Sequence, residues 1–231
     1  AYSLSFSKPL AVRQKRLKLA KTYSVKEIFY TLQGEGFHAG RPAVFCRFTG
    51  CNLWSGREVD RTAAVCQFCD TDFVGTDGQN GGKFTSAKAL AKMIASFWPD
   101  EKQGQPFVVM TGGEPALQLD NALVEALHSE GFEIAIETNG TLELPEGIDW
   151  VCVSPKGSSE IVLMEGHELK LVYPQKELRA QPEQFQNLKF EHFYIQPLDD
   201  QNALENRARC VKYCMQNPQW KLSIQTHKIL D

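Results

Sequence analysis

Short apolar runs with the character of β-strands alternate along the chain with segments of helical periodicity. Strands are expected at 25–32, 43–48, 107–110, 133–136, 150–153, 169–173, 193–195 and 222–225. Helices are expected at 85–98, 119–128 and 203–215, where apolar residues recur every three or four positions. Thr85 or Ser86 can cap the first helix, and Gly131 ends the second. This alternation is typical of βαβ units that build a parallel sheet.

Polar side chains gather where these strands end. The endings are Thr111–Pro115, Glu137–Gly140, Ser154–Lys156, Gln196–Pro197 and Gln225–His227. Turn formation explains the glycines and prolines, but not the recurring Glu, Thr, Lys, Gln and His. Active sites of α/β folds lie at the carboxyl ends of their strands. We therefore predict a single α/β domain, a partial or modified (β/α) barrel, with a doubly wound open sheet as the alternative.

The charge distribution separates the first residues from the rest. Residues 1–26 carry seven of the 25 Lys and Arg and no acid, so the remainder has 18 basic against 28 acidic residues, a net charge of −10. Such a body is unsuited to a phosphate backbone, and we expect no nucleic-acid partner. We assign residues 1–22 to a basic extension, flexible or artificial, with a nucleic-acid contact or a targeting segment as alternatives. Residues 23–231 form the catalytic domain.

Composition places the chain among ordinary globular proteins. It is 42% hydrophobic and 23% charged, which excludes disordered and collagen-like classes. No apolar stretch approaches the roughly 18 residues of a membrane span, so no membrane partner is expected. No secretory signal pattern is visible either. We expect a cytoplasmic protein.

The seven cysteines form two groups. An odd number without a secretion signal predicts reduced thiols. Cys51, Cys66 and Cys69 have the spacing C-x14-C-x2-C, and three thiolates can hold three corners of a tetrahedral site or three irons of a four-iron cluster. No further Cys or His follows at finger-like spacing, and the open position favours the cluster. The others are expected in the core: Cys46, Cys152, Cys210 and Cys214.

Several motifs together indicate a family. Three cysteines after the first predicted barrel strand, with Phe68 before the last of them and Gly112-Gly113-Glu114-Pro115 after the next strand, resemble the radical S-adenosylmethionine superfamily. Most members have C-x3-C-x2-C, so the gap here is enlarged. Four further segments are similar to the 7-carboxy-7-deazaguanine synthase family, some members of which carry this larger loop: Tyr30–Gly36, Phe45–Trp54, Cys69–Asp72 and Glu137–Gly140. The resemblance runs from about Tyr23 to the C-terminus.

The resemblance implies a reaction and its cofactors. Members of the family convert 6-carboxy-5,6,7,8-tetrahydropterin to 7-carboxy-7-deazaguanine and release ammonia, a step toward queuosine. It implies a 4Fe–4S cluster on the three cysteines, S-adenosylmethionine on the open iron, and Mg²⁺ held by Thr71. From the residues alone, Asp70 or Asp72 could instead be the ligand, or either could cap a helix. It also implies a reducing partner such as flavodoxin or ferredoxin, and a homodimer is expected.

The resemblance also assigns contacts. Those for S-adenosylmethionine are Phe68, Gly112, Gly113, Glu114, Asn139, Ser154, Lys156 and Gln196. Those for the substrate are Gln33, Glu35, Arg47, Thr111, Glu137 and His227. Glu137 would accept hydrogen bonds from the aminopyrimidine edge, and Arg47 would bind the substrate carboxylate as a fork.

Two other functions remain open from the sequence. One is a glycyl-radical activating enzyme of the same superfamily, against which the polar strand ends argue because a backbone glycine needs no aminopyrimidine partner. The other is a small zinc-binding or electron-transfer protein.

Overall fold

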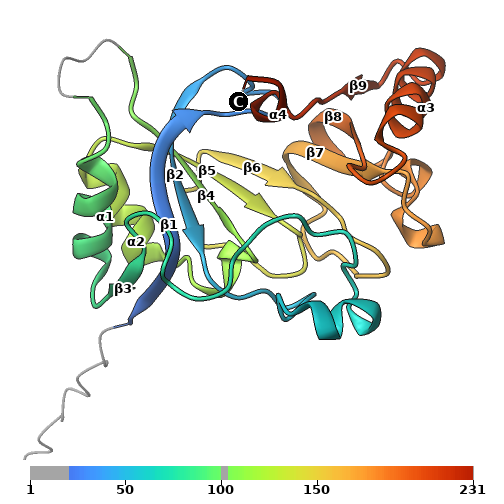
Figure 1. The fold of residues 1–231 in the computed structure, drawn as a ribbon. Helices are drawn as coiled ribbons and strands as arrows, with labels where there is room; N and C mark the ends of the chain where they lie inside the picture. The colour runs from blue at the N-terminus through green and yellow to red at the C-terminus, as the bar shows by residue number, and fades with distance from the viewer. Residues whose placement is uncertain (1–20, 100–103, 231) are drawn as a thin grey trace, which may run out of the picture.

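The structure, a computed structural model, describes residues 21–99 and 104–230, and its strands form one nine-stranded sheet (Figure 1). The spatial order is β3-β1-β2-β4-β5-β6-β7-β8-β9. The bounds are β1 (Tyr23–Leu32), β2 (Pro42–Phe48), β3 (Gly82–Phe84), β4 (Phe107–Gly112), β5 (Glu133–Thr138), β6 (Trp150–Val153), β7 (Glu165–Tyr173), β8 (Lys189–Pro197) and β9 (Trp220–Leu222).

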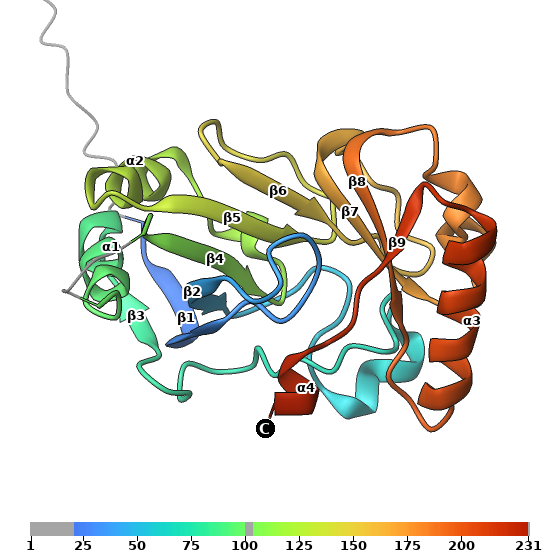
Figure 2. The same cartoon turned by 90° about the horizontal axis from the view of Figure 1, so that it is seen from above.

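From β2 onward the strands follow one another in chain order, except that β3 lies at the edge of the sheet beside β1. Each of the pairs from β2·β4 to β8·β9 is parallel, and only β1 joins its two neighbours antiparallel. A doubly wound sheet requires a point where the strand order reverses, and this sheet has none. The doubly wound alternative is therefore wrong, and the predicted partial barrel is confirmed. Figure 2 shows the sheet arching between α1 and α2 on one side and α3 on the other.

Alternation along the strands separates a helix-facing side from an inner side. On β4 and β5 the residues Val108, Met110, Ile134 and Ile136 belong to a buried cluster with α1 and α2. Val109 and Ala135 lie on the opposite, inner side in a separate buried cluster. Thr111 and Glu137 follow them at the same spacing and line a pocket.

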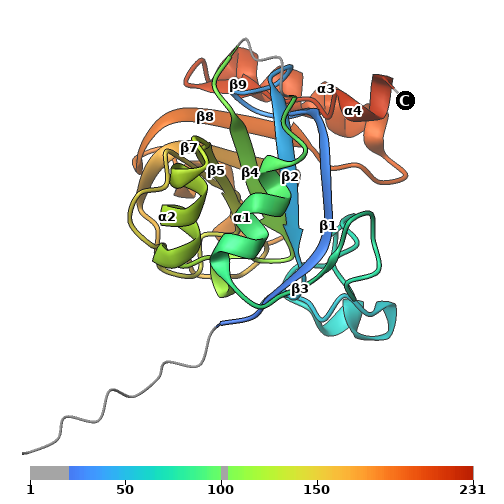
Figure 3. The same ribbon diagram turned by 90° about the vertical axis from the view of Figure 1, so that its left-hand side faces the viewer.

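Helices α1 (Ala87–Ala95) and α2 (Asn121–Ser129) lie side by side against the sheet (Figure 3). Ser86 caps α1, as predicted, because its side chain accepts a hydrogen bond from the Ala89 N–H. Asp120 caps α2 and also accepts from the Tyr23 hydroxyl at 2.7 Å. Gly131 follows α2 with a φ of 84°, the left-handed conformation that suits glycine.

The second core lies under α3 (Ala203–Gln216), where Cys210 packs with apolar residues of β6, β7 and β8. The strand expected at 222–225 is displaced toward the N-terminus, since β9 covers Trp220–Leu222. Trp220 is the reason: it is buried and packs on Phe193 with ring centroids 5.2 Å apart. Leu222 and Ile224, which suggested a strand, are exposed. The short helix α4 (His227–Leu230) follows at the open side of the arch (Figure 2).

Other expectations meet the structure as follows. Cys46, Cys152 and Cys210 are buried, as predicted, and Cys214 is half-buried against the α3 core. Lys26, the last of the seven basic residues counted in 1–26, lies in β1. It is 8% exposed and pairs with Asp72 and Asp77 at 2.8 Å. The extension at 1–22 falls almost wholly outside the described residues. No helix in the described ranges has the length and apolarity needed to cross a membrane.

Candidate active site

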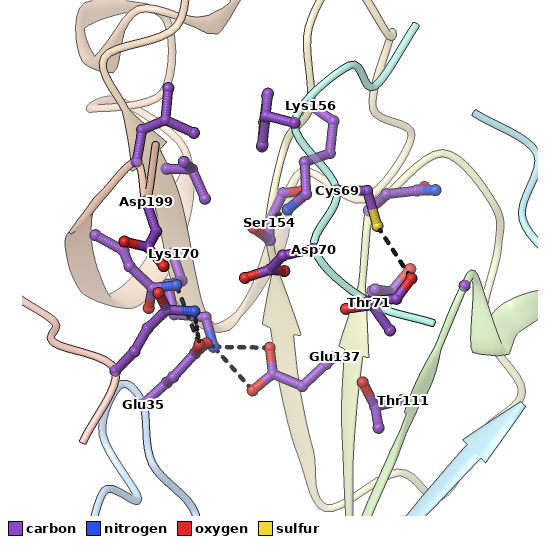
Figure 4. A pocket seen from close by; sticks show the side chains of 18 of the residues that line it. Glu35, Cys69, Asp70, Thr71, Thr111, Glu137, Ser154, Lys156, Lys170 and Asp199 are labelled. Atoms are coloured by element: carbon purple, nitrogen blue, oxygen red, sulfur yellow. Dashed lines mark hydrogen bonds and ion pairs between the residues drawn. The ribbon is translucent and has the colours of Figure 1, made fainter. Parts of the chain in front are cut away.

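A pocket opens at the carboxyl ends of the central strands (Figure 4). It collects most of the side chains that the sequence predicted for the cofactor and the substrate. Those lining it are Glu35, Phe68, Cys69, Thr71, Thr111, Gly112, Gly113, Glu137, Asn139, Ser154, Lys156 and Gln196. The residues come from six separate segments of the chain, so their convergence is a property of the fold.

The cysteine loop forms one wall of this pocket. Cys51 lies shortly after β2, and the enlarged gap to Cys66 forms a short 3₁₀ helix at Glu58–Ala63. Arg61 of this helix stacks on Trp54 at 4.0 Å and donates to the carbonyl oxygens of Gln67 and Cys69 at 3.1 and 3.0 Å. The insertion therefore holds the second half of the loop by main-chain contacts.

Of the three thiols, Cys69 has the lowered pKa that favours the thiolate form of a metal ligand. A hydrogen bond with Cys66 lowers the pKa of Cys69 to about 6, and the same bond raises the pKa of Cys66, because the two thiols share one proton. The Lys156 charge lowers the pKa of both. Burial raises the pKa of Cys51. A bound metal would replace the shared proton.

In the part of the chain that the structure describes, no three His, Cys, Asp or Glu side chains are arranged to hold one metal ion. A structural zinc ion needs all its ligands in one tetrahedral shell. A four-iron cluster instead takes each thiolate on a separate iron. Cys51, Cys66 and Cys69 belong to one loop, and of the three only Cys69 lines the pocket. One thiolate from each residue would fit three separate irons of such a cluster.

Two glycines allow β4 to approach the cysteine loop. Gly112 has a φ of 126°, and a Cβ there would lie 2.2 Å from the Phe48 carbonyl oxygen. A Cβ on Gly113 would lie 2.1 Å from the Gly50 carbonyl oxygen and 2.9 Å from Cys51 Cβ. The glycines thus permit a close backbone approach to the cysteine loop, and their predicted contact with S-adenosylmethionine stays a prediction.

Glu114 does not line the pocket. Its side chain is fully buried, and its carboxylate accepts hydrogen bonds from Ala116 N, Thr138 Oγ1 and Asn139 N at 2.9, 2.7 and 2.7 Å. Burial raises the pKa of this carboxyl. Glu114 therefore ties the end of β4 to the end of β5, a role that the sequence did not predict, and its contact with the cofactor stays a prediction.

The next strand ends bring amide and ammonium groups to the same wall. Asn139 donates from Nδ2 to Asn52 Oδ1 at 2.9 Å, which links the end of β5 to the residue after Cys51. Lys156 donates to the Ser154 carbonyl oxygen at 3.0 Å and to the Ser154 hydroxyl. These groups lie beside the thiols, where the polar parts of a cluster-bound ligand would be.

The opposite wall is acidic and contains a lysine that the sequence analysis missed. Lys170 of β7 is 3% exposed, and its ammonium lies 2.9 Å from both Glu35 Oε2 and Glu137 Oε2 (Figure 4). Gln33 also donates to Glu137, at 3.3 Å, and Gln196 donates to Glu35 at 3.1 Å. The alternation Glu168-Leu169-Lys170-Leu171 inside a strand was the available signal, since it places two charges on the inner face.

Some predicted residues lie near the pocket without lining it. Arg47 pairs in register with Thr111, and its Nε donates to Glu27 at 2.7 Å. Gln33 is buried behind Glu137. His227 was expected at the end of a strand, but it begins α4 instead. Its side chain is exposed and packs against Gly34.

The segment after the last cysteine is arranged by ion pairs. Asp72 forms an ion pair with Lys26 and accepts a hydrogen bond from Val74 N at 3.1 Å, and it does not line the pocket. Asp70 lines the pocket and pairs with Lys228 of α4 at 2.9 Å. Thr71 also lines the pocket, and no ion pair or side-chain hydrogen bond of the described residues uses its hydroxyl. A magnesium site at Thr71 would need most of its ligand oxygens from bound molecules.

An open α/β barrel with a three-cysteine loop at its strand ends and glycines packed against that loop defines a radical S-adenosylmethionine enzyme. In agreement, the model of the Radical SAM superfamily matches residues 61–170.

Relatives define the branch. A 7-carboxy-7-deazaguanine synthase of Bradyrhizobium diazoefficiens is 62% identical over 90% of this chain and 98% of its own. That of Bordetella pertussis is 61% identical with the same coverage of both chains. The crystal structure of QueE from Escherichia coli superposes with a TM-score of 0.67 at 28% identity, covering 88% of this chain and 94% of that one. The chain belongs to the 7-carboxy-7-deazaguanine synthase family.

Proposed function

We propose that this chain catalyses its family's reaction, the ring contraction of 6-carboxy-5,6,7,8-tetrahydropterin to 7-carboxy-7-deazaguanine with release of ammonia. The observation that carries the proposal is a single pocket with two unlike walls. One wall holds a thiol of the cysteine loop, and the other holds the paired carboxylates of Glu35 and Glu137. A donor-rich heterocycle therefore binds directly beside the cluster.

The cysteine wall holds the cofactors. Cys51, Cys66 and Cys69 would hold a 4Fe–4S cluster, which together with S-adenosylmethionine would supply a 5′-deoxyadenosyl radical when reduced. Lys156 and Ser154 would bind the polar end of the cofactor, and Phe68 its adenine. Gly113 packs against the cysteine loop and lines the pocket, where the methionine part would bind.

The acidic wall holds the substrate. Glu137 accepts hydrogen bonds from the ring N–H and the exocyclic amine of the pterin, which lie side by side as a carboxylate requires. Thr111 and Arg47, neighbours across β4 and β2 on the inner face, approach the rest of the ring and its carboxylate. A guanidinium already held at Nε by Glu27 keeps both terminal nitrogens for a carboxylate.

Further features of the family are proposed on the same basis. Thr71 binds Mg²⁺ together with substrate oxygens, since Mg²⁺ typically takes few protein ligands. A flavodoxin or ferredoxin reduces the cluster, and the protein is a cytoplasmic homodimer. Residues 1–22 are an extension outside the catalytic domain.

The test is anaerobic reconstitution followed by turnover. We expect four irons per chain, cleavage of S-adenosylmethionine under reduction, and conversion of the carboxypterin. Zinc without sulfide would instead support the small metal-binding alternative, and cofactor cleavage without pterin turnover would support a glycyl-radical activating enzyme. Thr71→Ala should weaken the Mg²⁺ dependence more than Asp72→Ala, whose carboxylate is bound to Lys26. Equal magnesium titrations for Thr71→Ala and the wild type would contradict the Mg²⁺ assignment.

A further inference from the structure

Lys170 is the most deeply buried cation of the pocket. It lies on the inner face of β7, between the carboxylate of Glu137 on β5 and that of Glu35 in the β1–β2 connection. Its ammonium donates to Glu137 Oε1 at 3.0 Å and to Glu137 Oε2 at 2.9 Å, and it forms an ion pair with Glu35 Oε2 at 2.9 Å. Lys170 is therefore engaged by both carboxylates.

The carboxylates keep free acceptor capacity. Glu35 also accepts from Gln196 and Gln225, at 3.1 and 2.9 Å, and Glu137 accepts from Gln33. A carboxylate has about four lone-pair positions, so each retains room for one more donor, and both line the pocket. A second pterin donor on Glu137 would take the place of Gln33, whose contact at 3.3 Å is the longest of the three. The wall therefore offers acceptors to a ligand, while its cation, which also lines the pocket, is already paired with both carboxylates.

The ammonium offsets a local excess of negative charge. Glu168 lies two residues before Lys170 on the same face and is 3% exposed, so three carboxyl groups surround one cation. Without the cation, neighbouring carboxylates would repel, and one would take up a proton. A protonated carboxyl presents a hydrogen where a donor-rich ring requires a lone pair.

We propose that Lys170 is a positioning residue for the substrate: it holds Glu35 and Glu137 as adjacent ionised acceptors and thereby makes this wall select a ring rich in N–H donors. The inference rests on the proposed function, because it takes these two carboxylates as substrate contacts. Lys170 acts through them and not by touching the substrate carboxylate.

Two ligands separate these roles. Binding of 6-carboxy-tetrahydropterin and of tetrahydropterin without the carboxylate is measured with the cluster-loaded protein and S-adenosylmethionine. Lys170→Met should weaken both at least about tenfold and leave S-adenosylmethionine binding unchanged, whereas Lys176→Met, which removes an exposed lysine, should change neither. Loss confined to the carboxylated pterin would show a direct contact and overturn the proposal, as would unchanged binding of both.

A double-substitution cycle distinguishes positioning from a loss of structure. If Lys170 acts through Glu137, Glu137→Gln should weaken pterin binding much less in the Lys170→Met background than in the wild type. Fully additive effects would overturn the proposal. If Lys170→Met alone fails to fold, Lys170→Met/Glu137→Gln, which removes one charge of each sign, is compared with Glu137→Gln. The double variant should bind both pterins more weakly, because Glu35 still loses its cation. A loss confined to the carboxylated pterin, or no loss, would overturn the proposal. A wild type that binds neither pterin would refute the proposed function itself.

Discussion

Glu114 offers a test in which the sequence motif and the structure assign different roles to one residue. As part of Gly112-Gly113-Glu114-Pro115 it was predicted to contact S-adenosylmethionine, yet its carboxylate is buried and holds two main-chain N–H groups and the Thr138 hydroxyl. Glu114→Gln keeps the shape. An amide has one acceptor oxygen, so its NH₂ must face Ala116 N or Asn139 N, and one buried N–H loses its partner.

The magnitude follows from that loss. A buried donor left unsatisfied costs about 1–3 kcal/mol. Burial of the charged carboxylate raises the pKa of Glu114, and the neutral amide avoids part of this burial cost. The expected loss in the free energy of unfolding therefore lies toward the lower half of this range. For a chain of this size each kcal/mol lowers the melting temperature by about 2–4 °C, so we expect a decrease of roughly 3–8 °C.

The assay combines thermal unfolding of the reconstituted protein with titration of S-adenosylmethionine. Glu125→Gln, an exposed acid on α2, controls for the loss of a charge. We expect Glu114→Gln to lower the melting temperature and to change cofactor affinity by less than about threefold, under 0.7 kcal/mol. An unchanged melting temperature with a larger loss of cofactor affinity would refute the structural role.

Three further outcomes are expected. Cys66→Ala should abolish cluster assembly, read as iron and sulfide content, whereas Cys214→Ala, at a half-buried core position, should not; a Cys66→Ala protein that still cleaves S-adenosylmethionine would contradict the assignment. Arg61→Met removes the donor to two loop carbonyls and should lower iron occupancy and broaden the cluster's paramagnetic resonance signal, and an unaltered cluster would disprove the clamp. Burial lowers the pKa of His38 to about 4, below its ordinary 6.5, so the unfolded chain binds more protons between these values and stability falls as pH drops through this window. His38→Leu should flatten the pH dependence of the melting temperature there, whereas His128→Leu, which removes a surface partner of an aspartate, should not.

The cysteine loop and the strand ends show most clearly how much of the fold and the candidate site could be predicted from the sequence. The motif spacing predicted Cys51, Cys66 and Cys69 as a group, and the structure places them in one loop with Cys69 at the pocket. Alternation of strands and helices predicted the parallel sheet, since period and length are local properties. The caps at Ser86 and Gly131 were likewise readable from adjacent residues.

Contacts between distant segments were not readable in this way. Lys170 lies in the middle of a strand, and only the arch of the sheet brings it between Glu35 and Glu137, which are 102 residues apart in the numbering. Glu114 is a motif residue by sequence, but the packing of β4 against β5 turned its carboxylate inward. At the C-terminus, Trp220 shifted β9 because burial of a large ring outweighs the weak alternation of Leu222 and Ile224. The sequence by itself determined which chemical groups the protein has and in which order the strands occur; the tertiary structure decided which of those groups face one another, because charge pairing and burial depend on distances that the chain order does not contain.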